Sequence, residues 1–352
     1  MLRLRIFVFA GGLMAVSVRC PAGANPASAS ASRTEAAQRL ASEVRNDGWL
    51  VFSARIQTPN WNLFIMRPDG SDRRRITDSP EFNEAGARFS PDGKRLLYYR
   101  IPASEGVDNN TYGTFDLVIA NADGTDPQVY GKDYPWASWG PDSRQIGCLT
   151  RRGIEVVDLA TRKLVRQIPR RGIVQQSIWS PDGRWFVGTA NGLGPYWNIG
   201  VLNAANGEWR AVSETDRYNC TPDWCPDSLH VVYARGIIPE KGGFAELWTA
   251  SIDGRQRRRI YAEAGHHIYG ACASPDGKYV LFTRSIEDLG RVISTKMALI
   301  CWPAIGPDTD SSSNVKSRAP VRLDLGPGWE PHWTSADISM AGKASQPGGA
   351  RQ

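Results

Sequence analysis

Histidine is the first residue type here whose chemistry could define a site. The chain has four, at His230, His266, His267 and His332, and two of these adjoin in the stretch His266-His267-Ile268-Tyr269. Neutral imidazoles bind transition metals and polar ligands. The pair is therefore a candidate binding site, with His332 as a further member. An exposed polar loop is the alternative, because no carboxylate or third histidine stands at metal-site spacing; we predict no bound metal and no cofactor.

A repeated carboxylate is the second candidate for chemistry. Asp92 lies in RFSPDGKRLLYY (Arg88–Tyr99), and similar stretches begin at Ala137, Ser177, Pro222 and Ala271, with a decayed copy at Pro331. In this motif proline fixes φ, aspartate bonds its own backbone and glycine accepts positive φ. We therefore interpret Asp92 and its copies as hairpin turn residues, not catalytic groups. Ser143 and Ser228 replace the glycine in two copies, which a turn tolerates.

Motifs of catalysis are otherwise absent from the sequence. There is no G-x-S-x-G elbow, H-E-x-x-H pair or Walker loop. The stretch Asn121–Asp126 places oxygens at alternate positions, but it lacks the full loop and distal glutamate of an EF-hand. Five cysteines follow residue 24 without CxxC spacing, so we expect small buried thiols, with a Cys220–Cys225 disulfide as the alternative. Catalysis is not favoured.

The elements that position these residues come in repeats. The motif prolines 91, 141, 181, 226 and 275 lie 40 to 50 residues apart, and each unit contains four β-rich segments. This period predicts an all-β fold, a six-bladed β-propeller of four-stranded antiparallel blades over residues 47–334. The chain enters at the second strand of a blade and leaves on an innermost strand. Leu50–Arg55 should therefore pair with Pro331–Trp333 and close the ring in one blade.

Strand direction separates two faces of the predicted propeller. The Asp-Gly hairpins are short and share one face, whereas the loops on the other face are long and dissimilar, which is typical of a binding surface. These loops are Ile56–Asn60, Ile101–Thr114, Asn191–Trp197, Gly236–Ala245 and Ser285–Thr295. At this loop-rich face we expect a channel mouth suited to peptide or sugar. Its candidate residues are His266, His267, Tyr269, His332, Trp136, Gln176 and Trp329.

Two further side-chain patterns have structural interpretations. Phe89, Trp139, Trp179, Trp224 and Trp333 recur once per unit before the turn, and we expect them to pack between blades. The arginine triplets Arg73–Arg75 and Arg257–Arg259 fall on outer strands, where charge discourages edge-to-edge pairing. With a net charge of only +6 and no single basic patch, we expect no nucleic-acid partner.

The terminal segments predict where the protein resides. Residues 1–24 read as a signal peptide, with Arg3 and Arg5 before the apolar run Ile6–Val18 and cleavage near Ala24. Arg19 before Cys20 disfavours a lipid anchor. No second long apolar run follows, so we do not expect the protein to span a membrane. We also expect a monomer. Residues 25–46 form a flexible leader or a short helix over Glu35–Val44, 306–320 a polar insertion, and 335–352 a disordered tail.

NLFIMRPDGSDRRRIT followed by ARFSPDGKRLLYY resembles the repeat of the TolB-type propeller family. The resemblance covers residues 48–334 and implies a six-bladed propeller, a periplasmic setting and a protein-binding role at the propeller mouth. TolB carries an α/β domain before its propeller, where this sequence has only residues 25–46.

Two functions are therefore expected from the sequence. The first is a secreted or periplasmic, non-catalytic scaffold that binds a protein or peptide through its loop-rich face. The alternative is a carbohydrate-active or metal-binding enzyme with histidines at its channel mouth, because some propeller-fold polysaccharide lyases use His-lined metal sites.

Overall fold

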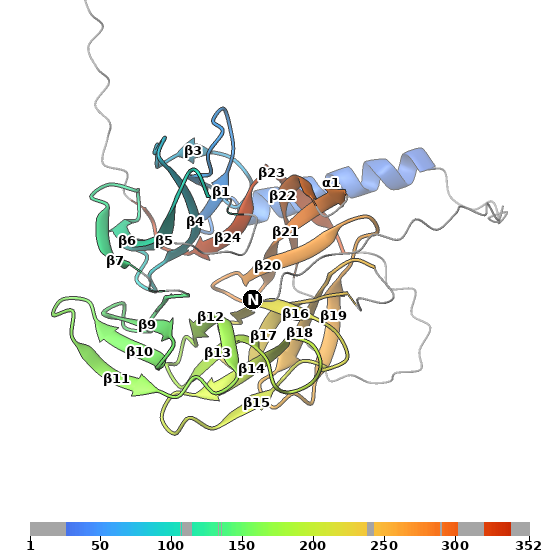
Figure 1. The fold of residues 1–352 in the computed structure, drawn as a ribbon. Coiled ribbons are helices and arrows are strands. Elements are labelled where there is room, and N and C mark those ends of the chain that lie inside the picture. Colours follow the sequence, from blue (N-terminus) through green and yellow to red (C-terminus); the bar gives the residue numbers. More distant parts are fainter. Residues whose placement is uncertain are drawn as a thin grey trace, which may run out of the picture.

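Six four-stranded antiparallel sheets form a closed ring around a central channel (Figure 1), which confirms the predicted fold. This computed structural model describes residues 26–105, 107, 115–132, 134, 136–237, 243–288, 291–301 and 320–338. We number the blades from the one that holds the first strand, and give the strands of each from the channel outward.

Blade 1 contains β24 (Trp329–Thr334), β1 (Trp49–Ala54), β2 (Asn62–Met66) and β3 (Arg74–Arg75). Blade 2 contains β4 (Phe82–Phe89), β5 (Arg95–Pro102), β6 (Asp116–Asn121) and β7 (Gln128–Lys132). Blade 3 contains β8 (Ser138–Trp139), β9 (Gln145–Thr150), β10 (Gly153–Asp158) and β11 (Leu164–Ile168). Blade 4 contains β12 (Ile173–Trp179), β13 (Trp185–Ala190), β14 (Asn198–Asn203) and β15 (Trp209–Ala211). Blade 5 contains β16 (Asn219–Trp224), β17 (His230–Arg235), β18 (Glu246–Ser251) and β19 (Arg257–Tyr261). Blade 6 contains β20 (His267–Ala273), β21 (Tyr279–Asp288), β22 (Arg291–Cys301) and β23 (Arg322–Pro327).

Blade 1 joins the two ends of the propeller, as predicted. Strand β24 pairs antiparallel with β1, with Leu50 opposite Trp333 and Val51 opposite His332. The innermost strand of this blade thus comes from the end of the ring and the other three from its beginning, an arrangement that leaves no open sheet edge between first and last blades.

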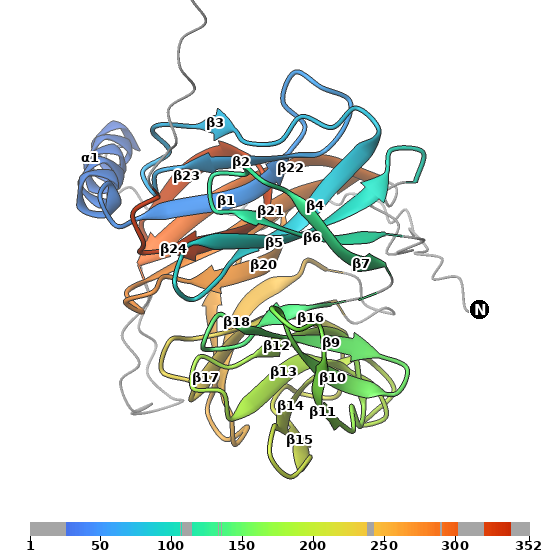
Figure 2. The same ribbon diagram turned by 90° about the vertical axis from the view of Figure 1, so that its left-hand side faces the viewer.

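The segments flanking the propeller pack against it. Helix α1 (Pro26–Val44) is longer than the expected helix and lies beside β23 on the outside of the ring (Figure 2). Its Leu40 and Val44 enter the apolar core of blades 6 and 1. At the other end Ile338 is buried in the same apolar cluster as Trp49. The predicted signal peptide, most of the polar insertion and residues 339–352 lie outside the described residues.

The repeated aspartate is a turn residue, as the motif indicated. Asp92 Oδ1 accepts hydrogen bonds from Ser90 Oγ at 2.6 Å and from Lys94 N at 3.1 Å, and Gly93 takes φ +68°. Ser143, in the glycine position of the next blade, keeps a positive φ of 59° and accepts a bond from Asp92 N at 3.1 Å. The serine that replaces glycine thus links neighbouring blades.

The aromatic and arginine patterns also have structural roles. The Nε1 atom of Trp139 in blade 3 donates to the Arg88 carbonyl of blade 2 at 3.0 Å. Directly before β3, Arg73 Nη1 donates to the Pro327 carbonyl of blade 6 at 3.0 Å. On β19, Arg257 Nε donates to the Val212 carbonyl beside β15 of blade 4 at 2.8 Å. These two arginines therefore tie blade 1 to blade 6 and blade 5 to blade 4.

Two alternatives from the sequence are corrected by the strands. The expected loop Ser285–Thr295 is largely the end of a long hairpin in which β21 pairs with β22, with Ile286 opposite Ser294. Cys220 and Cys225 do not form a disulfide. No helix of the described residues is long and apolar enough to cross a membrane.

Candidate functional site

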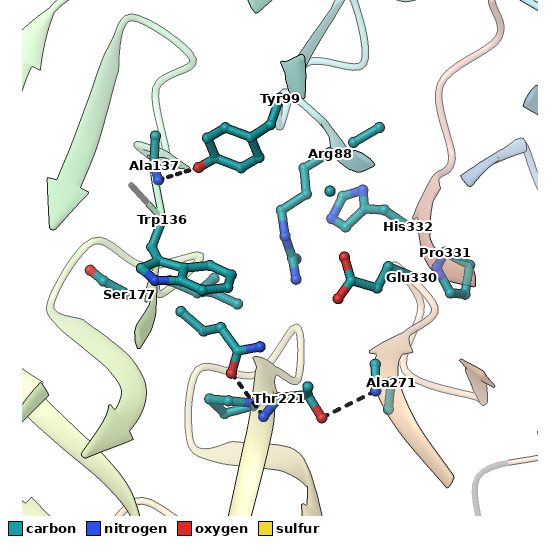
Figure 3. Close-up of a pocket in the computed structure, with 16 residues that line it drawn as sticks. Arg88, Tyr99, Trp136, Ala137, Ser177, Thr221, Ala271, Glu330, Pro331 and His332 are labelled. Atoms are coloured by element: carbon teal, nitrogen blue, oxygen red, sulfur yellow. Dashed lines mark hydrogen bonds between the residues drawn. The ribbon is translucent and has the colours of Figure 1, made fainter. Parts of the chain in front are cut away.

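A small cavity of ≈ 60 Å³ lies in the central channel, and the innermost segments of all six blades line it (Figure 3). Apart from Tyr99 on β5, its residues follow the repeat, because they occupy the three positions before the aromatic column of each unit. The first ring contains Gly86, Trp136, Gln176, Thr221, Gly270 and Glu330. The second contains the small residues Ala87, Ala137, Ser177, Pro222, Ala271 and Pro331. The third contains Arg88, Ser138, Ile178, Asp223, Cys272 and His332, of which Arg88, Ile178 and His332 line the cavity directly.

Every residue of the first ring has left-handed backbone. In ring order the φ values are 66°, 52°, 54°, 48°, 56° and 47°. In blade 4, for example, the pairing of β12 with β13 shifts register between Gln175 and Ile178, around the ring residue Gln176. Non-glycine residues rarely adopt this conformation, and four of the six are not glycine. Such strain persists only where the surroundings enforce it, and it is typical of functional sites.

Side chains from neighbouring blades hold these bulges in place. Gln176 Oε1 accepts from Thr221 N at 2.9 Å, and Thr221 Oγ1 accepts from Gly270 N at 3.1 Å. Thr283 Oγ1 accepts from Glu330 N at 3.0 Å. The bonds therefore pass from blade to blade from 4 through 6 to 1. Between blades 2 and 3 the Tyr99 hydroxyl accepts from Ala137 N at 2.6 Å.

An ion pair crosses the channel. Arg88 Nη1 of blade 2 lies 2.7 Å from Asp223 Oδ2 of blade 5, three blades away around a ring of six. The Arg88 side chain is 29% exposed and that of Asp223 only 8%. Burial works against the charged guanidinium, but the Asp223 carboxylate outweighs it, so the pKa of Arg88 is raised. The channel is thus spanned by a permanent cation paired with one carboxylate.

Asp223, Cys272 and His332 bring three potential metal-ligand atoms within 4.8 Å of one another. Each already has a contact: Asp223 holds Arg88, the Cys272 thiol donates to the Ala273 carbonyl at 3.2 Å, and His332 Nδ1 accepts from Phe89 N at 3.2 Å. Burial raises the pKa of Cys272 to about 12, with help from Asp223. A metal would therefore have to displace Arg88 and a thiol proton.

His332 is neutral in this environment. Burial, assisted by the Arg88 cation, lowers the pKa of His332 to about 3. Its Nδ1 atom must carry a lone pair to accept the Phe89 hydrogen bond, so the proton of the neutral ring is on Nε2. The neutral imidazole therefore offers one hydrogen-bond donor, at Nε2.

Glu330 differs from its neighbours. Neither of its carboxylate oxygens has a hydrogen bond or ion pair within the described part of the chain. Burial raises the pKa of Glu330 to about 7, and the Arg88 charge only partly opposes this shift. Figure 3 shows the carboxyl group pointing into the space beside the Arg88 guanidinium.

The candidate residues from the sequence divide into two groups. Trp136, Gln176 and His332 line the cavity. The other four lie outside its lining, and Trp329 packs on Trp61 with ring centroids 5.2 Å apart.

Local partners hold the blade 6 candidates. His266 Nε2 lies 3.1 Å from Arg284 Nη2. His267 Nδ1 accepts from Ala245 N at 3.2 Å, and Tyr269 lies opposite Thr283 between β20 and β21. The adjacent histidines are therefore not brought to the cavity with His332.

Sequence reasoning missed Arg88, Asp223 and Cys272 as site residues. The signal was present in the repeat alignment, because these residues occupy the column directly before the recurring aromatic position. That column holds an arginine, an aspartate, a cysteine and a histidine among its six members, whereas a purely structural column would be uniformly apolar or small.

Comparison with known proteins places this site in a familiar fold. The crystal structure of TolB from Acinetobacter baumannii superposes with a TM-score of 0.58 at 14% identity, over 82% of this chain and 67% of that one. An oligogalacturonate lyase in complex with manganese gives a TM-score of 0.45 at 15% identity, over 73% and 72% of the two chains.

Among curated proteins, an uncharacterized peptidase, YuxL of Bacillus subtilis (strain 168), is 21% identical over 217 residues. The match takes in 57% of this chain but only 29% of the length of that relative. No protein-family model matches the sequence. At the level of the fold, the superposition confirms the predicted resemblance: this chain forms a six-bladed propeller similar to that of TolB.

Proposed function

We propose that this protein is a non-catalytic binding module, secreted or periplasmic, that takes a peptide segment of a protein partner at its central channel. The observation that carries the proposal is the ring of left-handed bulges, fixed by bonds between blades around an open cavity. A site whose backbone is already fixed loses little conformational freedom on binding. Trp136 and Arg88 at its wall are of residue types that dominate binding energy in protein interfaces.

The side chains of the channel also support binding over catalysis. A nucleophile requires an adjacent base or a lowered pKa. Cys272 has a raised pKa and its thiol donates a hydrogen bond to a carbonyl, while the lone pair of His332 Nδ1 accepts from the Phe89 amide. A secreted or periplasmic location follows from the predicted signal peptide in residues 1–24.

The test is selection of peptides from a random library on the immobilised protein. We expect enriched peptides whose affinity falls at least tenfold in Trp136→Asn, since asparagine tolerates left-handed backbone but removes the indole. Val165→Ser on β11, at an exposed position far from the channel residues in the blade, is the control and should bind normally. Failure to enrich any peptide, or normal affinity in a stably folded Trp136→Asn variant, would contradict the proposal.

A metal-dependent enzyme, including one acting on carbohydrate, is the second candidate, and the Asp223–Cys272–His332 cluster favours it. Metal analysis of the purified protein, with Cys272→Ser as comparison, separates the two. Stoichiometric metal that is lost in the variant would support the enzyme and count against a purely binding role.

A further inference from the structure

Resting on the proposed function, we propose that the cavity binds a primary ammonium group of its peptide ligand, from a lysine side chain or a free amino terminus, through the Glu330 carboxylate.

The first argument is the balance of charge in the channel. Arg88 supplies one positive charge and Asp223, at 2.7 Å, cancels it. The carboxyl group of Glu330 also lines the cavity and has no hydrogen bond or ion pair among the described residues. Its carboxylate form therefore adds one negative charge that no described residue pairs. A ligand with one positive charge restores neutrality.

The second argument is the position of the Glu330 carboxyl group. Its backbone is pinned by the bond from Glu330 N to Thr283 Oγ1, at 3.0 Å, so the side chain leaves the strand from a fixed point. Glu330 is only partly exposed, and a partly desolvated carboxylate without hydrogen bonds is less stable than one paired with a cation. An ammonium group brings three donors and a charge to this position.

The third argument is the wall around that carboxyl group. Trp136 and Glu330 flank the guanidinium of Arg88 on opposite sides in Figure 3. The second ring contributes only small residues, such as Ala87 and Ala271, which leave the cavity open beside the acid. The indole offers an apolar surface for a methylene stem and a π face for a cation. A guanidinium already occupies part of the channel, so the compact ammonium suits the remaining ≈ 60 Å³ better.

Four small probes test the inference on the full chain. Nα-acetyl-lysine amide carries an ε-ammonium, glycinamide carries an α-ammonium, Nα-acetyl-norleucine amide is the uncharged match to the first, and ammonium chloride reports simple cation binding. Affinities are measured by ligand-observed NMR at pH 8, on wild type, on Glu330→Gln and on the control Asp78→Asn. Asp78 is an exposed carboxylate on the outside of blade 1.

We expect at least one of the two amine-bearing organic probes to bind tenfold or more tightly than the norleucine compound at pH 8. That preference should disappear in Glu330→Gln and persist in Asp78→Asn. The stronger of the two probes identifies the source of the ammonium group.

Three results would overturn the inference: equal binding of the norleucine compound, unchanged preference in a folded Glu330→Gln protein, or ammonium chloride binding as tightly as the organic probes. Library peptides that bind without a lysine or a free amino terminus would contradict the ammonium site but leave the proposed peptide binding intact. If the ammonium probes bind but the library enriches no peptide, the ammonium site is supported and the proposed peptide binding is contradicted.

Discussion

Arg88 and Asp223 are 135 residues apart in sequence, yet their side chains meet at 2.7 Å across the channel. The pair connects opposite blades, 2 and 5, where the other polar contacts described connect neighbours. It therefore restrains the ring across its diameter, and its removal should lower the stability of the whole propeller.

Arg88→Met should lower the free energy of unfolding by about 3 kcal/mol, because it leaves the Asp223 carboxylate buried and unpaired. Adding Asp223→Asn should recover much of this loss. Arg75→Met is the matched control, since its partner Asp78 is exposed and such pairs contribute about 0–1 kcal/mol. Urea unfolding measures all three, and equal effects of the Arg88 and Arg75 substitutions would contradict the assignment.

Ser228→Ala should destabilise the propeller by about 1–2 kcal/mol, because Asp182 N loses the Oγ acceptor that lies 3.1 Å away in the next blade. Ser228→Gly loses the same bond but suits the φ of 55°, so its effect should be smaller. Thermal unfolding compares the two variants. If the glycine variant were less stable than the alanine variant, the strain of a side chain at positive φ would not explain the difference in stability between them.

Glu330→Gln should change how stability depends on pH. Folding raises the pKa of Glu330 from 4.5 to about 7, so the folded protein holds a proton that the unfolded chain releases. This group therefore lowers the free energy of unfolding progressively as pH rises from 4.5 to 7. The loss is complete above pH 7. Because glutamine resembles the protonated form, the variant should gain stability over wild type across that window. Urea unfolding at pH 4.5, 6 and 8 checks it; a constant difference would contradict the shifted pKa.

His332→Asn should have the opposite pH profile. The pKa of His332 falls from 6.5 to about 3 on folding, so the unfolded chain binds the extra proton. Wild-type stability from this group is complete above pH 6.5 and is lost as pH falls toward 3. The asparagine oxygen can still accept from Phe89 N, so the variant should fold and lose less stability between pH 6.5 and 4. Parallel stability curves for the two proteins would refute a buried neutral histidine.

The sequence predicted those features that depend on local chemistry or on the repeat. The turn at Asp92 follows from three adjacent residues, and the pairing of Leu50 with Trp333 follows from the phase of the units. The site was harder, because a channel collects one short segment from each blade. His266 seemed to belong there, but Arg284 and Glu263 hold it within blade 6. No local sequence pattern predicts the contact between Arg88 and Asp223. Only the alignment of the repeats shows that both residues occupy the same position of their units and so face the central channel.

Strand β24, the last of the ring in chain order, carries both Glu330 and His332. A folding intermediate with five complete blades and an undocked β24 would contain Arg88 paired to Asp223 but neither the acid nor the neutral imidazole. Closing the ring and completing the channel are therefore one event. The protein cannot bind through Glu330 before its architecture is finished, so ligand recognition reports on the integrity of the entire ring.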